Sequence, residues 1–189
     1  MNKTAAIRAL IEATSTDPII FTTGYSCRIA RNVSDRPNHF YMTGSMGLAA
    51  SIGTGIALST GRLVVVVDGD GALAMNPGCL LTAGALPHLP LLHLVLDDGR
   101  YDSTGGQRVP SRRINFTALA EAAGYTGVWH VDDLSKFREL LHSEVRTCTS
   151  PTFVHCELTE EDEAGTPPRI EAELAQHQLR FSGHLTSPV

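Results

Sequence analysis

The chain has 189 residues, of which 42% are hydrophobic and 19% charged, and its net charge at pH 7 is -5. These values are typical of a globular protein of one domain and exclude disorder over most of the length. The longest apolar stretches fall well short of the ~20 residues that cross a bilayer, and no basic segment could follow a nucleic-acid backbone. The amino-terminal residues lack the features of a secretory signal, so we expect a cytoplasmic protein.

Strands and helices alternate along the chain. Apolar runs of strand length, several of them β-branched, predict strands at 18–22, 39–42, 63–67, 91–96, 127–131 and 152–158. Segments of helical spacing or helical composition predict helices at 3–14, 25–32, 46–59, 77–86, 116–123 and 133–147. Repeated β-α units predict an α/β fold, a doubly wound parallel sheet with helices on both faces.

The alternation is interrupted in two places. Segment 99–115 is polar, rich in glycine and without periodicity, and a loop of that length indicates function rather than simple connection. After residue 158 an acidic run and a pair of prolines end the pattern. We therefore expect one domain over 1–158 and a carboxyl-terminal tail over 159–189, with one short helix near 169–179. The four cysteines form no CxxC pair and are expected to be reduced thiols, mostly buried.

Three predicted strands end in residues suited to ligand binding. These are TTG at 22–24, GDG at 69–71 and DDG at 97–99. In an open parallel sheet, ligands bind beyond the carboxyl ends of the strands. Glycine and aspartate are also ordinary turn residues, but three such ends together favour a ligand site.

The segment 69–74 has two interpretations. It fits the G-x-G-x-x-G/A fingerprint of dinucleotide-binding proteins, which would make the chain an oxidoreductase. Asp70 argues against this, because at ~4 Å and an effective dielectric of ~20 a carboxylate and a phosphate charge repel by about 4 kcal/mol. A divalent cation between them reverses the sign, and Asp70 and Asp98 would suit Mg2+. Asn-Pro-Gly at 76–78 also interrupts the helix that the fingerprint requires. A metal–diphosphate site is favoured.

The GDG at 69–71, followed 28 positions after Asp70 by Asp98, resembles the thiamine-diphosphate motif. TTGYSCR at 22–28, GSMG at 44–47 and LDDGRYDSTGGQ at 96–107 resemble the diphosphate-binding (PP) domain of phosphonopyruvate and sulfopyruvate decarboxylases. The resemblance runs in order over most of the chain. It implies the thiamin diphosphate-binding fold, with thiamine diphosphate and Mg2+ as cofactors.

The resemblance also implies roles for individual residues. Mg2+ would be held by Asp70, Asp98 and the backbone carbonyl of Arg100. The backbone amides of Gly71 and Ala72 would face the diphosphate at the start of a helix, where unpaired N–H groups favour anions. The further cofactor-binding positions would be Thr23, Gly24, Tyr25, Gly44, Ser45, Met46 and Gly69.

In the loop after the metal site, Asp102, Ser103 and Thr104 would approach the cofactor and substrate, with Ser103 and Thr104 as catalytic residues. Asp98 stands where the family usually has Asn. We expect the extra negative charge either to be offset by Arg100, Arg108 or Arg28 or to make Mg2+ binding weaker than usual. The three arginines of the loop would either neutralise a phosphonate or sulfonate or form a solvated basic face: Arg108, Arg112 and Arg113.

The family requires a glutamate that activates the aminopyrimidine of the cofactor. A separate pyrimidine-binding domain supplies it, and the resemblance leaves no room for that domain here. We therefore expect a pyrimidine-binding (alpha-type) partner subunit in a hetero-oligomer such as α2β2 or larger, or else a fragment of a longer enzyme.

The activity that the resemblance implies is decarboxylation of phosphonopyruvate to phosphonoacetaldehyde and CO2. DSTGGQ at 102–107 resembles the phosphonopyruvate branch somewhat better than the sulfopyruvate branch. The alternatives are a sulfopyruvate decarboxylase beta subunit and a carboligase on the same scaffold. From a different class, the chain could be a non-catalytic cofactor-binding subunit, which would bind Mg2+ without turnover.

Overall fold

The computed structural model describes residues 1–162, 165–171 and 173–187, and its main element is a sheet of six parallel strands in the order β2-β1-β3-β4-β8-β7. All six predicted strands are confirmed. Their bounds are Ile19–Phe21 (β1), His39–Tyr41 (β2), Val64–Gly69 (β3), Leu91–Asp97 (β4), Gly127–Val131 (β7) and Thr152–Glu157 (β8).

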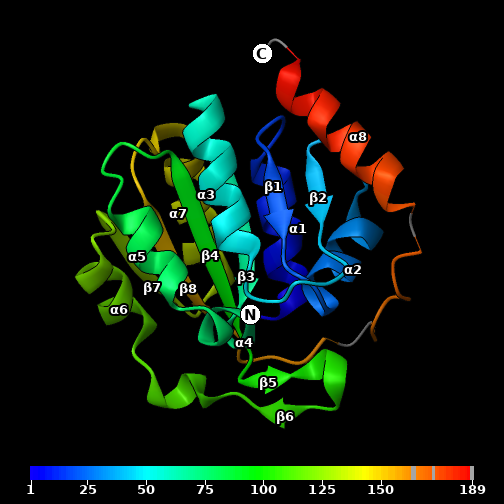
Figure 1. Ribbon diagram of the computed structural model, residues 1–189. Helices are drawn as coiled ribbons and strands as arrows, with labels where there is room; N and C mark the ends of the chain where they lie inside the picture. Colours follow the sequence, from blue (N-terminus) through cyan, green and yellow to red (C-terminus); the bar gives the residue numbers. More distant parts are fainter. Residues whose placement is uncertain (163–164, 172, 188–189) are drawn as a thin grey trace.

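Helices cover both faces of the sheet (Figure 1), so the predicted doubly wound α/β architecture is confirmed. On one face lie α1 (Lys3–Ala13), α2 (Tyr25–Val33) and α7 (Leu134–Thr147). On the other lie α3 (Ala49–Thr60), α5 (Gly78–Gly84) and α6 (Phe116–Ala123). No helix among the described residues is long and apolar enough to cross a membrane.

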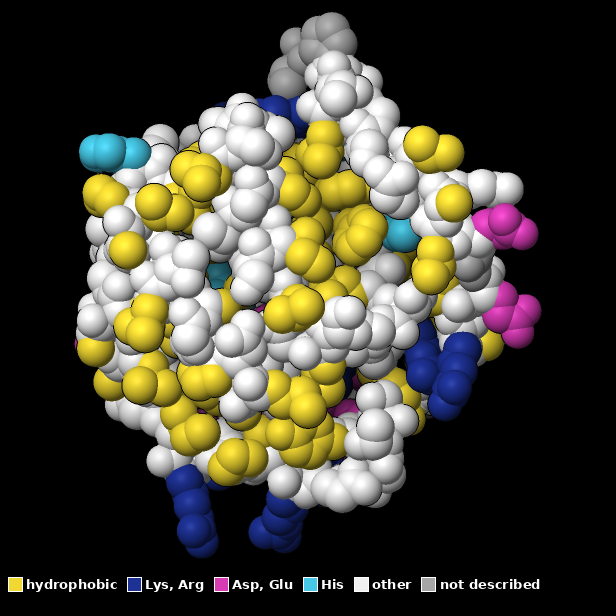
Figure 2. Space-filling view, in the orientation of Figure 1, with side chains coloured by type: hydrophobic (Ala, Val, Ile, Leu, Met, Phe, Trp, Pro, Cys, Tyr) yellow, Lys and Arg dark blue, Asp and Glu magenta, His cyan; other side chains and the backbone are white. Residues whose placement is uncertain are grey.

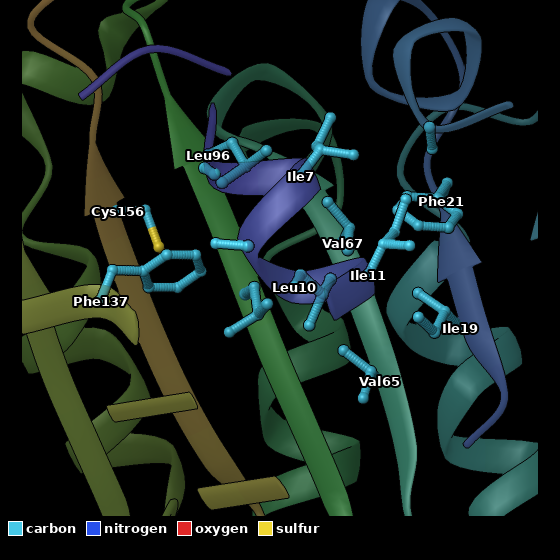
Figure 3. Packing of buried hydrophobic residues seen from close by; sticks show 14 of the residues in the cluster. Ile7, Leu10, Ile11, Ile19, Phe21, Val65, Val67, Leu96, Phe137 and Cys156 are labelled. Carbon is cyan, nitrogen blue, oxygen red and sulfur yellow. The ribbon is translucent and has the colours of Figure 1, made fainter. Parts of the chain in front are cut away.

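Helix α1 is held against the sheet by its apolar stripe. Ile7, Leu10 and Ile11 are at most 2% exposed and face the side chains of the central strands, among them Val65 and Val67 (Figure 3). Their i, i+3, i+4 spacing places them on one side of the helix, and burial of each stabilises the fold by about 1.5–3 kcal/mol. This packing fixes the start of α1 at the carboxyl edge of the sheet.

The sheet has a switch point between β1 and β3. After β1 the chain continues into α2 on one face, and after β3 it continues towards α5 on the opposite face. Because β1 and β3 are hydrogen-bonded neighbours whose following segments depart to opposite sides, their carboxyl ends border a crevice.

Two predicted helices begin or divide differently in the structure. The helix predicted from 46 begins at Ala49, because Ser45 and Gly47 have φ of 56° and 90° and form a turn before it. A short helix, α4 (Asp70–Met75), precedes α5, and the predicted interruption at 76–78 separates the two. The helix is interrupted because Pro77 has no N–H to donate to the preceding turn.

The predicted position of the tail helix, near 169–179, is wrong: α8 spans Leu174–Thr186. Phe181 explains the shift, because it is 4% exposed and packs against Phe40 of strand β2 with ring centroids 5.2 Å apart. Burial of this ring carries the helix beyond the predicted end. The four cysteines are unpaired, as expected, and only Cys148 is partly exposed.

The polar loop at 99–115 contains short ordered elements that its sequence does not predict. Strands β5 (Arg100–Tyr101) and β6 (Gln107–Arg108) pair as an antiparallel hairpin around a single 3-10 turn, Asp102–Thr104. A second 3-10 turn follows at Pro110–Arg113. The hairpin lies beneath the carboxyl edge of the main sheet (Figure 1).

Candidate functional site

The carboxyl ends of β1, β3 and β4 lie next to one another in the sheet, as the sequence predicts. Thr22 directly follows β1, Asp70 begins α4 directly after β3, and Asp98 directly follows β4. Three segments that are far apart in the sequence thus meet at one edge.

Asp70 is a buried carboxylate without a hydrogen-bond donor on one of its oxygens. The residue is 3% exposed, and its Oδ2 accepts no hydrogen bond. Burial and then the negative charge of Asp97 raise the pKa of Asp70 to about 7, and Asp98 adds to the effect. An unpaired buried carboxylate is costly unless a cation accompanies it. The position therefore fits a metal ion.

Asp98 is engaged through both of its oxygens. Oδ2 lies 2.5 Å from Nζ of Lys3, and Oδ1 accepts a hydrogen bond from the backbone N–H of Arg100 at 3.3 Å. Burial opposes ionisation of Asp98, but the Lys3 ammonium outweighs it and holds the pKa below its ordinary value. Asp98 is therefore ionised, and its counter-charge is Lys3.

The expectation that an arginine offsets Asp98 is wrong. Among the described residues, neither Arg28, Arg100 nor Arg108 forms an ion pair with it. Arg28 lies instead over the ring of Tyr25, 5.4 Å from its centroid. Lys3 takes the role because α1 packs across β3 and β4 and presents its first turn to the end of β4.

The carboxylates alone do not form a complete metal cage. Within the described residues, no three His, Cys, Asp or Glu side chains gather in a way that could hold a metal ion. Two carboxylates and one backbone carbonyl fit a Mg2+ ion that takes its remaining ligands from water and from phosphate oxygens. The donors present are oxygens, as Mg2+ prefers.

Asp97 belongs to the DDG at 97–99, but its sequence context predicts no role of its own. It is 1% exposed and accepts hydrogen bonds from the N–H of Gly99 at 3.0 Å and the hydroxyl of Ser111 at 3.1 Å. Its other oxygen lies 2.9 Å from Nε2 of His155 on β8. Burial opposes ionisation, but the hydrogen bond with His155 helps to hold the pKa of Asp97 below its ordinary value. Asp97 thus links the end of β4 to the loop at 99–115 and to strand β8.

Ser103 lies close to the end of β1. Thr23, Gly24 and Ser103 line a cleft of about 250 Å³, next to Met42 and Thr43, which follow β2. Thr104 does not join them: its hydroxyl donates to the Tyr101 carbonyl at 3.2 Å, within its own hairpin, and the residue is exposed. The structure therefore brings Ser103 to the predicted cofactor positions and leaves Thr104 outside.

A second cleft, of about 380 Å³, contains two of the three predicted metal-site residues, Asp98 and Arg100. Tyr25, Lys3 and Asp102 also line it. The ring of Tyr25 also lies 6.0 Å from Nζ of Lys3. Tyr25 thus borders the Asp98 side of the site.

Gly71 and Ala72 form the first turn of α4. Gly69 precedes this helix without a side-chain cap, so no capping side chain satisfies its first amides. A Cβ on Gly71 would come within 2.3 Å of the Tyr101 ring, so only glycine fits beneath that ring. Tyr101 therefore covers the start of α4.

Gly44, Ser45 and Met46 lie in the turn between β2 and α3. They line neither of the two clefts. The turn is fastened to α4 instead, because the Asn76 side-chain amide donates to the carbonyl of Gly47 at 2.9 Å. These three positions remain predictions.

Residues 22–156 match the family model described as "Thiamine pyrophosphate enzyme, C-terminal TPP binding domain". The chain belongs to this family, and the resemblance inferred from its motifs is confirmed.

Two relatives place it more narrowly. The chain is 43% identical over 185 residues to a phosphonopyruvate decarboxylase of Streptomyces viridochromogenes, a match that covers 96% of this chain and 45% of that protein. It is 37% identical over 155 residues to a sulfopyruvate decarboxylase subunit beta of Methanothermobacter thermautotrophicus, covering 82% and 80%. The chain thus spans less than half of the first relative.

A crystal structure from Mycobacterium smegmatis, of a protein assigned as thiamin diphosphate-dependent, supports the same fold. Its TM-score against this chain is 0.70 at 20% sequence identity, over 85% of this chain and 32% of that one. At this identity the match confirms the fold alone.

Proposed function

We propose that this chain is the thiamine diphosphate- and Mg2+-binding subunit of a cytoplasmic, two-subunit 2-oxoacid decarboxylase that acts on phosphonopyruvate. The observation that carries the proposal is the buried, unpartnered carboxylate oxygen of Asp70, beside Asp98 at the edge where β1, β3 and β4 end. The family match supports the cofactor, and the 43% identical relative supports the reaction.

Each part of the site has a task in this proposal. Asp70, Asp98 and the Arg100 carbonyl hold Mg2+, and the amides of Gly71 and Ala72 bind the diphosphate. When bound, thiamine diphosphate supplies the electron sink for loss of CO2.

The end of β1 faces the diphosphate, and the hairpin faces the substrate. Thr23 and Gly24 contact the diphosphate, and Ser103, which lies in the same cleft, orients the substrate. Arg112 is already paired with Glu157, and we assign the phosphonate contact to Arg108 because it lies on the same hairpin as Ser103. A guanidinium presents several donors to an oxyanion of this kind.

The activating glutamate comes from a pyrimidine-binding partner subunit. A relative of about this chain's length is itself called subunit beta, and the phosphonopyruvate decarboxylase relative is about twice as long. Apolar side chains are exposed on the face formed by α3 to α5, seen in Figure 2, and such a face suits a protein partner. They are Leu48, Leu58, Met75 and Leu81, each at least 45% exposed.

Sulfopyruvate is the second candidate substrate, because the sulfopyruvate decarboxylase subunit beta matches this chain over 80% of its own length. The deciding experiment measures CO2 release from phosphonopyruvate and from sulfopyruvate with thiamine diphosphate and Mg2+. The chain is assayed alone and with the product of a neighbouring gene of similar size. We expect activity only in the mixture, faster with phosphonopyruvate.

Asp70→Asn, assayed in the same mixture, should abolish turnover. Activity of the chain alone would contradict the partner glutamate. CO2 release accompanied by carbon–carbon bond formation with an added aldehyde, in place of protonation, would indicate a carboligase. Cofactor binding without turnover would indicate a non-catalytic subunit.

A further inference from the structure

Lys3 is buried between two carboxylates at the border of the proposed metal site. Its Nζ lies 2.5 Å from Oδ2 of Asp98 and 3.4 Å from Oδ2 of Asp102. The side chain is 12% exposed, whereas the chain's other lysine, Lys136, is 71% exposed. An ammonium so enclosed is costly unless it is paired, so the two carboxylates determine where it lies.

The backbone that carries Lys3 is firmly placed. The Asn2 side chain caps α1 by accepting from the N–H of Ala5 at 2.8 Å, and the N–H of Thr4 donates to Asp162 at 3.0 Å. The apolar stripe of α1 is buried in the core. Only the flexible lysine side chain is therefore able to change partners.

Both oxygens of Asp98 already have a partner. Oδ1 accepts from the Arg100 N–H and Oδ2 contacts Lys3. Mg2+ binds carboxylate oxygens at about 2.0–2.1 Å and repels a nearby ammonium, so the ion and Lys3 compete for this carboxylate. Asp102 is the second partner already within reach.

We propose that Lys3 is an internal counter-cation that holds Asp98 while the site lacks metal and transfers to Asp102 when Mg2+ binds. The inference rests on the proposed function, since it requires that Asp98 is a metal ligand. In this proposal the Lys3 ammonium lowers the affinity for Mg2+, because it competes for Asp98. It also couples metal binding to the Asp102–Thr104 turn, where Ser103 lies.

The test measures Mn2+ affinity by electron paramagnetic resonance, with thiamine diphosphate present, on the chain together with its pyrimidine-binding subunit. Lys3→Met should tighten Mn2+ binding about tenfold, because the competitor is removed and the apolar stem is kept. Lys136→Met is the matched control and should leave the affinity unchanged. Asp102→Asn should weaken binding several-fold, because Lys3 then has no second partner.

Opposite shifts in Lys3→Met and Asp102→Asn cannot arise from general loss of structure, which would weaken binding in both. In an Asp98→Asn background, Lys3→Met should change the affinity less than about twofold, since the pair is already broken. If the wild type binds Mn2+ and Lys3→Met binds it with the same or lower affinity, the role of Lys3 is overturned and the proposed function is not. Absence of Mn2+ binding in the wild type would overturn the proposed function and this inference together.

Discussion

The Ser103 hydroxyl lies directly beside Gly24: a Cβ on Gly24 would come within 3.3 Å of that oxygen. The two residues belong to different parts of the fold, the hairpin after β4 and the turn between β1 and α2. Their proximity joins the loop that would face substrate to the strand end that would face the diphosphate. Each therefore limits the space available to the other.

Gly24→Ala should lower both stability and cofactor affinity. With φ of 103° and ψ of -138°, the position is essentially reserved for glycine, and a side chain there costs about 1–3 kcal/mol. The added methyl would also press on Ser103. Gly106→Ala is the control, because that glycine has φ of 74° but no neighbour near its Cβ.

Thermal unfolding and thiamine diphosphate titration check this pair of variants. Both should be destabilised, but only Gly24→Ala should raise the dissociation constant of the cofactor. Equal affinity in both variants would show that the contact with Ser103 has no influence on binding.

Asp70→Asn should change stability and activity in opposite directions. Without divalent cations, the amide relieves a buried charge that lies beside Asp97 and Asp98, and we expect a gain of roughly 2 kcal/mol in unfolding free energy at pH 8. Decarboxylation with the partner subunit should be lost. Urea unfolding in the presence of a chelator measures the first effect.

The control for that experiment is Asp132→Asn, an exposed carboxylate that pairs with Lys136 on the surface. It should shift the unfolding free energy by less than about 0.5 kcal/mol. Destabilisation by Asp70→Asn would show that Asp70 is not an uncompensated charge.

His39 should make the fold sensitive to acid. The residue is fully buried, its Nδ1 lies 3.1 Å from the Ser34 carbonyl, and its Nε2 has no partner. Burial lowers the pKa of His39 from 6.5 to about 4. Between these values the unfolded chain binds the proton and the folded chain does not, so stability falls as pH drops from 6.5 towards 4 and is unaffected above.

The loss attributable to His39 should reach about 3 kcal/mol at pH 4. His39→Gln should flatten that part of the stability profile, while His142→Gln, an exposed position, should retain it. Denaturant unfolding at a series of pH values provides the comparison. Parallel profiles for His39→Gln and the wild type would assign the acid sensitivity to other groups.

Phe181→Ala should release helix α8 and leave the rest of the fold intact. The ring packs on Phe40 and is the one side chain of the described part of α8 that is buried. The other contacts of α8 are more exposed, such as partly buried Leu185 and the Tyr41 N–H that donates to His177 at 3.0 Å. Loss of a buried aromatic ring costs about 3–5 kcal/mol, more than a single helix on an edge strand is expected to retain.

Amide hydrogen exchange should then be fast across α8 and unchanged in β3 and β4. Leu179→Ala removes a side chain that is 67% exposed and should leave exchange in α8 slow. If Phe181→Ala accelerated exchange throughout the sheet, α8 would be an integral part of the domain.

The sheet could be predicted because a strand that is buried on both faces has a continuously apolar sequence. Runs such as 63–67 and 91–96 are continuously apolar, and they became β3 and β4 with little change in their bounds. Asp70 and Asp98 could be predicted for a similar reason, since carboxylates directly after buried strands must lie at the ligand-binding edge.

Lys3 could not be found this way, because its partner lies 95 positions away and helix packing alone brings them together. The available signal was indirect: a carboxylate in place of the usual Asn needs a cation, and the chain has only two lysines. The position of Asp97 at the site could be predicted from the DDG at 97–99, but its role could not, because that role depends on its partners. Those partners, Ser111 and His155, are supplied by a distant turn and by strand β8.

The position of Lys3 has a practical consequence for producing the protein. The amino terminus lies beside the carboxyl edge of the sheet, whereas α8 runs to the opposite pole, where His184 contacts the Thr16 carbonyl ahead of β1 (Figure 1). An affinity tag fused before residue 1 would add bulk and charge next to Asp98 and Asp102. A tag placed after α8 would project away from them, so metal and cofactor titrations are best made on protein tagged at that end.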